Sequence, residues 1–152
     1  MPFIMVTRFN NETWKQLNDY KKGRQIEGAF YGVPRRIAET IPLKAKLFVL
    51  EMNNETNTIM GVGLIHNFIK MDETHNIYSW GNYHRFTYLG KKRIDRDEMT
   101  RDEMELIEKM EGIVFKGKGH LKRGQGIQKV PYDRYNKDDL NLFTDMFKGR
   151  SS

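Results

Sequence analysis

Basic side chains gather in one glycine-rich stretch of the 152-residue sequence. The stretch GKGHLKRGQG, residues 117–126, combines three lysine and arginine side chains with backbone N–H groups that glycine leaves free to turn inward. Such a loop can hold phosphate through amide, ammonium and guanidinium groups, although a flexible, solvated loop has the same composition. The residues that we predict to contact phosphate are Lys116, Lys118, His120, Lys122 and Arg123.

The charge of the chain is distributed unevenly. It has 26 Lys and Arg against 20 Asp and Glu, which gives a formal net charge of +6. Residues 112–136 contain six basic side chains and one acid, Asp133, so this region supplies most of the excess. The placement favours an anionic partner, which can be nucleic acid, a nucleotide or an acidic protein surface.

Aromatic rings form a third group with possible chemistry. Phe30 and Tyr31 lie between glycines, and a second aromatic segment includes Trp80 and is mixed with His84 and Arg85. Rings beside basic groups suit single-stranded nucleic acid, because each stacked base contributes about 1–3 kcal/mol. Core packing is the alternative for each ring.

Other chemistry has weaker support. The four histidines show no HxxxH or HExxH spacing, and the absence of cysteine excludes thiolate zinc sites and thiol nucleophiles. The dinucleotide-binding and Walker motifs are both incomplete, so we predict no cofactor. An enzyme that processes nucleic acid with a divalent metal stays as an alternative, using Glu51, His66 or His84.

Composition and length favour a single domain over residues 1–152. The longest run without a polar side chain, residues 59–65, is far shorter than the ~20 residues that a membrane-spanning helix needs. The N-terminus lacks the pattern of a signal peptide, and the chain has no cysteine. We therefore expect an intracellular protein, of the cytoplasm or nucleus, with no membrane partner.

Periodicity and turn residues predict an α+β domain, in which three or four helices flank a small, strongly curved, barrel-like sheet. A capping box at Thr100 gives the firmest helix, and Asn10 and Asn136 are candidate caps for two more. The expected strands are residues 2–9, 47–52, 58–67, 76–89 and 113–115. Residues 29–34 are expected to form a loop and residues 35–40 a short helix.

The order of several segments resembles the PUA-like superfamily, in particular its EVE and YTH branches. The matching segments are FIMVTRF followed by NNETW, then GAFYGVP, KLFVLEMN, TIMGVGLI and IYSWGNYHRFTYL. The resemblance covers about residues 2–90 and implies a barrel-like sheet whose open end accepts one extruded, often modified, base. Residues 91–148 would then form a helical extension that carries the glycine-rich basic stretch of residues 117–126.

The resemblance also implies which residues would line the base pocket. The polar wall would be Thr7, Arg8, Asn10 and Asn11, and the aromatic wall would be Phe30 or Tyr31 with Trp80. The tryptophan pair of the YTH methyl cage is not reproduced, because Phe or Tyr stands at position 30 or 31. Arg85 is added as a basic neighbour of the pocket.

These observations together predict a nucleic-acid-binding module. It would accommodate a single-stranded or flipped base of RNA or DNA in an aromatic pocket and hold the phosphates with the basic loop. The first alternative is a protein-interaction module whose basic surface meets an acidic partner. The second is the metal-dependent enzyme described above.

Overall fold

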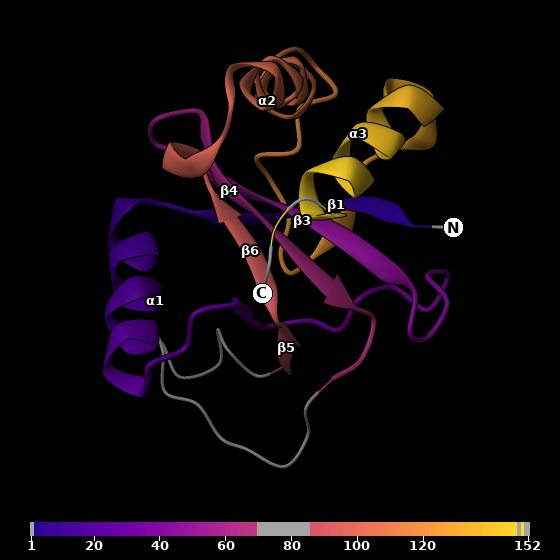
Figure 1. The fold of residues 1–152 in the computed structure, drawn as a ribbon. Coiled ribbons are helices and arrows are strands. Elements are labelled where there is room, and N and C mark those ends of the chain that lie inside the picture. Colours follow the sequence, from indigo (N-terminus) through magenta and orange to yellow (C-terminus); the bar gives the residue numbers. More distant parts are fainter. Residues whose placement is uncertain (1, 70–85, 149, 151–152) are drawn as a thin grey trace.

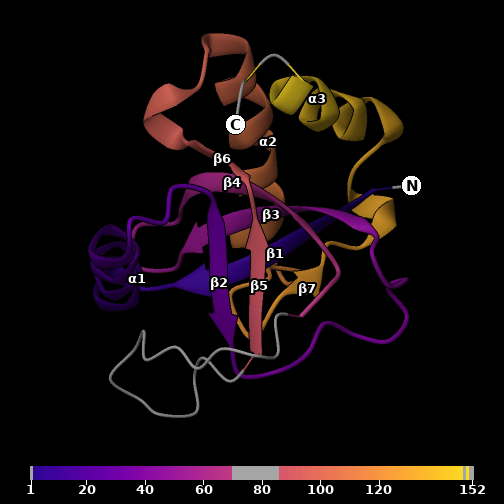
Figure 2. The ribbon, with the colours of Figure 1, turned by 60° about the horizontal axis from the view of Figure 1, so that its bottom comes forward.

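The computed structural model describes residues 2–69, 86–148 and 150 of the chain. Its strands form a five-stranded sheet in the order β6-β4-β3-β1-β7 and a two-stranded sheet of β2 and β5 (Figure 1 and, for β2 and β7, Figure 2). The strands are β1 (Phe3–Phe9), β2 (Ala29–Val33), β3 (Lys46–Asn53), β4 (Thr58–His66), β5 (Phe86–Gly90), β6 (Lys92–Asp95) and β7 (Gln128–Lys129).

Most neighbours in the larger sheet are antiparallel, and the central pair β1 and β3 is parallel. Helix α1 (Asn11–Arg24) follows β1, so the chain passes through a helix before β3 returns beside β1. Two further helices, α2 (Arg101–Phe115) and α3 (Lys137–Lys148), complete the α+β architecture, and this predicted class is confirmed. Two short 3-10 helices are η1 (Arg96–Glu98) and η2 (Tyr132–Arg134).

The two sheets are joined by one continuous segment. Strand β5 pairs with β2, Lys91 follows, and β6 then pairs with β4. Figure 2 shows β5 and β6 as successive parts of this segment. Among the described strands β1 pairs with β3 and β7, and β2 pairs with β5, so the ladders do not close into a barrel between β1 and β2.

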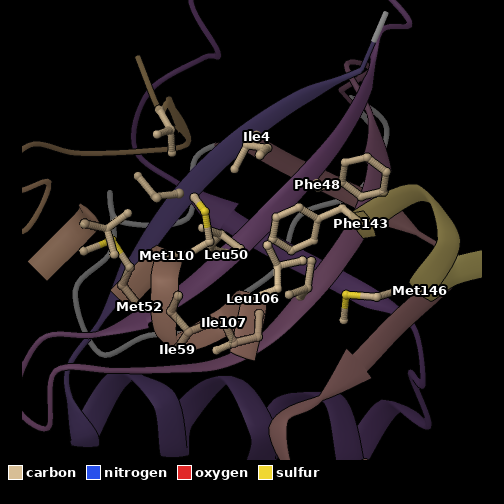
Figure 3. Close-up of a cluster of buried hydrophobic side chains, with 14 of the residues drawn as sticks. Ile4, Phe48, Leu50, Met52, Ile59, Leu106, Ile107, Met110, Phe143 and Met146 are labelled. Atoms are coloured by element: carbon tan, nitrogen blue, oxygen red, sulfur yellow. The ribbon is translucent and has the colours of Figure 1, made fainter. Parts of the chain in front are cut away.

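Alternating side chains give the central sheet two apolar faces. Ile4 and Val6 of β1 pack with α2 and α3, whereas Phe3 and Met5 pack on the opposite face with α1, β2 and β5. Successive side chains of a strand point to opposite faces, which explains why β1 belongs to both clusters. Figure 3 shows part of the first cluster, in which Phe48 of β3 meets Phe143 of α3.

Polar side chains fix where the helices begin. Asn10 accepts a hydrogen bond from the Thr13 N–H at the start of α1, and Thr100 accepts one from the Glu103 N–H at the start of α2. Asn136 likewise accepts from the Asp139 N–H ahead of α3. These caps satisfy N–H groups that a helix end leaves without a partner, and all three helix starts match the sequence prediction.

Three predicted elements are wrong. Residues 29–34 are not a loop, because β2 pairs with β5 and is buried along its whole length. Residues 35–40 do not form a helix, and the Ile37 N–H instead donates to the Tyr88 hydroxyl. Residues 113–115 are the last turn of α2, because Val114 and Phe115 continue its buried face. Of the strand expected at 76–89, residues 76–85 lie outside the described residues, and the rest is in β5.

No helix in the described part of the chain has the length and apolar character required to cross a membrane.

The close approach of β5 to β4 predicts a large effect at Gly90. A Cβ atom there would overlap the Leu64 carbonyl oxygen, which belongs to the backbone and cannot rotate away. We expect Gly90→Ala to lower the free energy of unfolding by about 1–3 kcal/mol, measured by urea denaturation. Gly112→Ala is the control, because that helical glycine has open space and alanine should stabilise it by about 0.5–1 kcal/mol. Equal stability of Gly90→Ala and the parent would contradict the close approach.

Candidate functional site

A small pocket lies where β1 and β2 are not paired. Residues 7–9 of β1, 31–34 of β2 and its continuation, and 124–126 of the glycine-rich stretch line it, and we call it the β1–β2 pocket. Its volume of about 20 Å³ suffices for about one water molecule. Three predicted site residues, Thr7, Arg8 and Tyr31, therefore meet the predicted phosphate loop here, in a space too small for a nucleobase.

Arg8 ties the glycine-rich stretch to the edge of β1. Its Nε donates to the Leu121 carbonyl at 2.6 Å, Nη1 donates to the Gly126 carbonyl at 3.1 Å, and Nη2 donates to Gln128 Oε1 at 2.5 Å. The prediction that Arg8 offers hydrogen bonds to a base edge is wrong for this conformation, because its donors face the protein. Arg8 instead determines where the loop lies.

Further hydrogen bonds hold residues 116–126, which we call the basic loop. Asn54 Nδ2 donates to the Lys122 carbonyl at 2.8 Å, and Arg35 Nε donates to Gln125 Oε1 at 3.1 Å. Arg134 of η2 donates to the Gly119 carbonyl. The loop is therefore tied at several points by side chains from four separate parts of the chain.

The cations of the basic loop are accessible to solvent. Lys116, Lys118 and Arg123 are exposed, and Lys122 is partly exposed. Among the described residues, none of the four forms an ion pair with a carboxylate. His120 is partly buried, and its Nδ1 accepts the Lys122 N–H at 3.2 Å, so this ring shapes the loop. The loop thus presents positive charge that is not neutralised by an ion pair with any carboxylate of the described residues.

The predicted polar wall divides between two roles. Thr7 is buried and lines the β1–β2 pocket. Asn10 caps α1, while Asn11 donates through Nδ2 to Glu55 at 2.9 Å and accepts from Asn53 at 2.9 Å. Asn10 thus serves the start of α1 and Asn11 the junction between α1 and the β3–β4 turn, and a contact of either residue with a ligand stays a prediction.

The predicted aromatic wall belongs to the core. The ring of Phe30 is buried against Tyr20, with ring centroids 5.6 Å apart, and Tyr31 is buried with its hydroxyl donating to Glu51 Oε2 at 2.6 Å. Neither ring presents an open face for stacking in this conformation, so this part of the prediction is wrong. Trp80 and Arg85 lie outside the described residues.

Glu51 is the centre of a buried polar network under α1. Its carboxylate accepts the Tyr31 hydroxyl and three bonds of 2.6–3.0 Å from Arg93, and Arg93 also bonds Asp95 at 3.0 Å. Burial alone would lower the pKa of Arg93, but the charge and hydrogen bonds of Glu51 outweigh it and hold that pKa above its ordinary value. The Arg93 guanidinium also lies 5.4 Å from the centre of the Trp14 ring.

This network removes Glu51 from the catalytic alternative. A residue that is 1% exposed, with both carboxylate oxygens bound to Arg93 and Tyr31, offers no free lone pair to a metal or a water. His66 is exposed, and His84 lies outside the described residues. The described part of the chain also brings no three metal-binding side chains together.

Sequence reasoning missed the charged residue beside this network. Lys21 is buried on the inner face of α1. Burial and the neighbouring Arg93 charge lower the pKa of Lys21, while Glu51 and Asp95 act in the opposite direction. The helical spacing of Lys21 with Trp14 and Leu17 could have indicated its inward position. Arg35, which anchors Gln125, was also missed, and its sequence context carries no comparable signal.

Comparison with known proteins supplies no assignment. No family model matches the chain, and no curated protein matches it either.

The position of Lys21 predicts a pH-dependent cost to stability. The pKa of Lys21 is lower in the folded chain than the ordinary value of 10.5. At a pH between these two pKa values, the unfolded chain therefore binds more protons than the folded chain. At a pH below both values, the buried charge of Lys21 opposes folding in full. We expect Lys21→Met to raise the free energy of unfolding by about 1 kcal/mol at neutral pH. The gain should shrink as the pH approaches 10.5 in urea titrations. Exposed Lys22→Met is the control, and a gain independent of pH would disprove this explanation.

Proposed function

We propose that this chain is a single-stranded nucleic-acid-binding module. The basic loop holds the phosphates, and the β1–β2 pocket beside it takes the base-reading role. One observation carries the proposal: the loop cations Lys116, Lys118, Lys122 and Arg123 have no carboxylate partner in the described part of the chain and stand on a loop held by Arg8 and Asn54.

An anchored loop is better suited to phosphate than a mobile one. Ordering a free segment on binding costs conformational entropy, and that cost is smaller when hydrogen bonds already hold the backbone. Gly117, Gly124 and Gly126 have positive φ values, which turn the backbone at both ends of the loop. The lysine and arginine side chains of residues 116–123 then supply charge without a large rearrangement of the main chain that carries them.

The PUA-like resemblance belongs to the same proposal. The continuous segment of β5 and β6 bridges the two sheets, as a curved, barrel-like arrangement requires, and the remaining opening lies between β1 and β2. Ordinary ligand pockets have about 300–1,000 Å³. A flipped base, modified or not, would therefore enter after residues 124–126 move away from β2.

Loss of loop charge should change the salt dependence of binding. Four phosphate contacts predict a slope of about −3 for log K against log salt concentration on single strands. Replacing Lys116, Lys118, Lys122 and Arg123 together by alanine should flatten this slope and weaken all sequences alike, measured by fluorescence anisotropy with labelled RNA and DNA.

The matched control removes four exposed charges elsewhere, at Lys22, Lys46, Lys91 and Lys148. It has the same net charge as the loop variant and should keep most of the parent's slope. If both variants lost slope equally, the total charge and not the loop would bind the strand. If an acidic protein competitor displaced the strand readily and an acidic peptide bound alone with the same loop dependence, the partner would be a protein.

A disulfide can test whether the loop must open for base reading. The chain has no cysteine, and a Cβ placed at Gly126 would lie 3.5 Å from the Cβ of Arg35, within disulfide range. We expect the oxidised Arg35→Cys, Gly126→Cys variant to keep salt-dependent binding but to lose discrimination among bases.

Reduction of the same sample should restore that discrimination, which controls for loss of the Arg35 charge and for strain at the positive φ of Gly126. Identical base preference in the oxidised and reduced forms would show that the β1–β2 pocket does not read bases.

A further inference from the structure

One ring beside the basic loop remains exposed. Tyr132 begins η2 and has half of its surface accessible to solvent, at 50%. By contrast, Phe30 and Tyr31 are each 1% exposed. Stacking on a nucleobase needs an accessible ring face, so Tyr132 meets a requirement that the two buried rings do not.

The Tyr132 ring is held in place from the protein side. Its centroid lies 5.8 Å from that of Phe3 at the start of β1 and 6.3 Å from that of Tyr135. Both contacts are tilted, with interplanar angles of 48° and 47°, and neither covers the ring face to face. A supported ring loses little conformational freedom when a ligand arrives, which favours its use as a stacking surface.

Two basic side chains and one acid lie near this ring. Lys129 Nζ lies over the Tyr132 ring, 4.7 Å from its centroid, so a stacking base would use the other face or displace this ammonium group. Arg134 and the acid Asp133 share the turn of η2. Because Arg134 donates to the Gly119 carbonyl, the turn is joined directly to the basic loop between Lys118 and His120. A base on Tyr132 would therefore lie beside Lys129 and on a turn that is joined to the basic loop.

The edge of the sheet connects this ring to the rest of the basic surface. In the antiparallel pairing of β7 with β1, Lys129 stands opposite Met5 and Gln128 opposite Val6. Phe3 contacts Tyr132 at one end of β1, and Arg8 holds the basic loop toward the other end. At about 3.3 Å per residue, these two positions are about 17 Å apart, which leaves room for several nucleotides of an extended strand.

We propose that Tyr132 is a base-stacking residue, on which one unpaired nucleobase lies while Lys129 and the basic loop hold the neighbouring phosphates. The inference rests on the proposed nucleic-acid function and names the residue that would give it a preference for single strands, because a duplex keeps its bases stacked inside. It also separates this ring from the β1–β2 pocket, so base stacking needs no opening of the loop.

The test compares a base-bearing single strand with an abasic oligomer of the same charge, and adds the duplex as a ligand whose bases are not available for stacking. Binding of a labelled single-stranded oligonucleotide, an abasic oligomer of equal length and the matching duplex is measured by anisotropy at one fixed salt concentration. We expect Tyr132→Ala to weaken binding of the base-bearing single strand about 5-fold or more. Binding of the abasic oligomer should stay within about 2-fold of the parent, and the parent should prefer the single strand to the abasic one.

Two variants keep the result interpretable. Tyr132→Trp retains a stacking surface and should bind the single strand as well as the parent or better. Phe68→Ala removes another exposed ring, 64% accessible, which lines a different pocket that contains no residue of the basic loop, and it should leave binding unchanged. Circular dichroism and thermal unfolding of Tyr132→Ala exclude a folding defect caused by the lost contact with Phe3.

Failure of this inference differs from failure of the proposed function. If the parent bound the single strand with the expected salt dependence but Tyr132→Ala lost no affinity, or lost it equally for the abasic oligomer, the stacking role would be overturned. If the parent bound none of the three oligomers at low salt, the nucleic-acid function itself would be wrong.

Discussion

The carboxylate of Glu51 joins three strands in the interior. It lies on β3 and accepts bonds from Tyr31 on β2 and Arg93 on β6, so it links the two-stranded sheet to the five-stranded one. Taking a carboxylate and a guanidinium out of water costs several kcal/mol per ion, and close geometry with additional hydrogen bonds must offset that cost. The network therefore restricts the relative positions of β2, β3 and β6 to an arrangement that preserves all of these bonds.

This restriction extends to the surrounding backbone. A Cβ at Gly63 would overlap the Tyr31 hydroxyl, and one at Gly61 would lie within 3 Å of both Arg93 and Glu51. The two glycines of β4 thus make room for the buried polar groups. The edge of β2 then ends beside β1, where the pairing stops and the β1–β2 pocket forms.

Arg8 has the corresponding role on the surface. A guanidinium group is planar and has several donors, so it can bind several acceptors at once. The Arg8 guanidinium binds the carbonyls of Leu121 and Gly126 and the side-chain amide of Gln128, all in the segment that follows α2. The segment after α2 is thereby placed along the edge of β1, with its cations outward and its glycines against the pocket. Arg8, which the sequence analysis predicted to contact the ligand, instead positions the residues that we propose to bind it.

The sequence alone determined the α+β class, the β3–β4 hairpin, the starts of all three helices and the basic character of residues 116–126. These features depend on local patterns: alternation in strands, capping side chains, and the spacing of charges along the chain. Tertiary structure decided that residues 29–33 are a strand, that Phe30 and Tyr31 are buried, and that Arg8 faces the loop. Each of these depends on partners distant in sequence, such as β5, Glu51 and Gly126, and the types of the residues themselves are compatible with either a core or a ligand-binding position. The exposure of Tyr132 beside Lys129 was likewise decided by the packing of η2 against β1. In the sequence, a tyrosine close to basic residues looks the same whether its ring is exposed or buried.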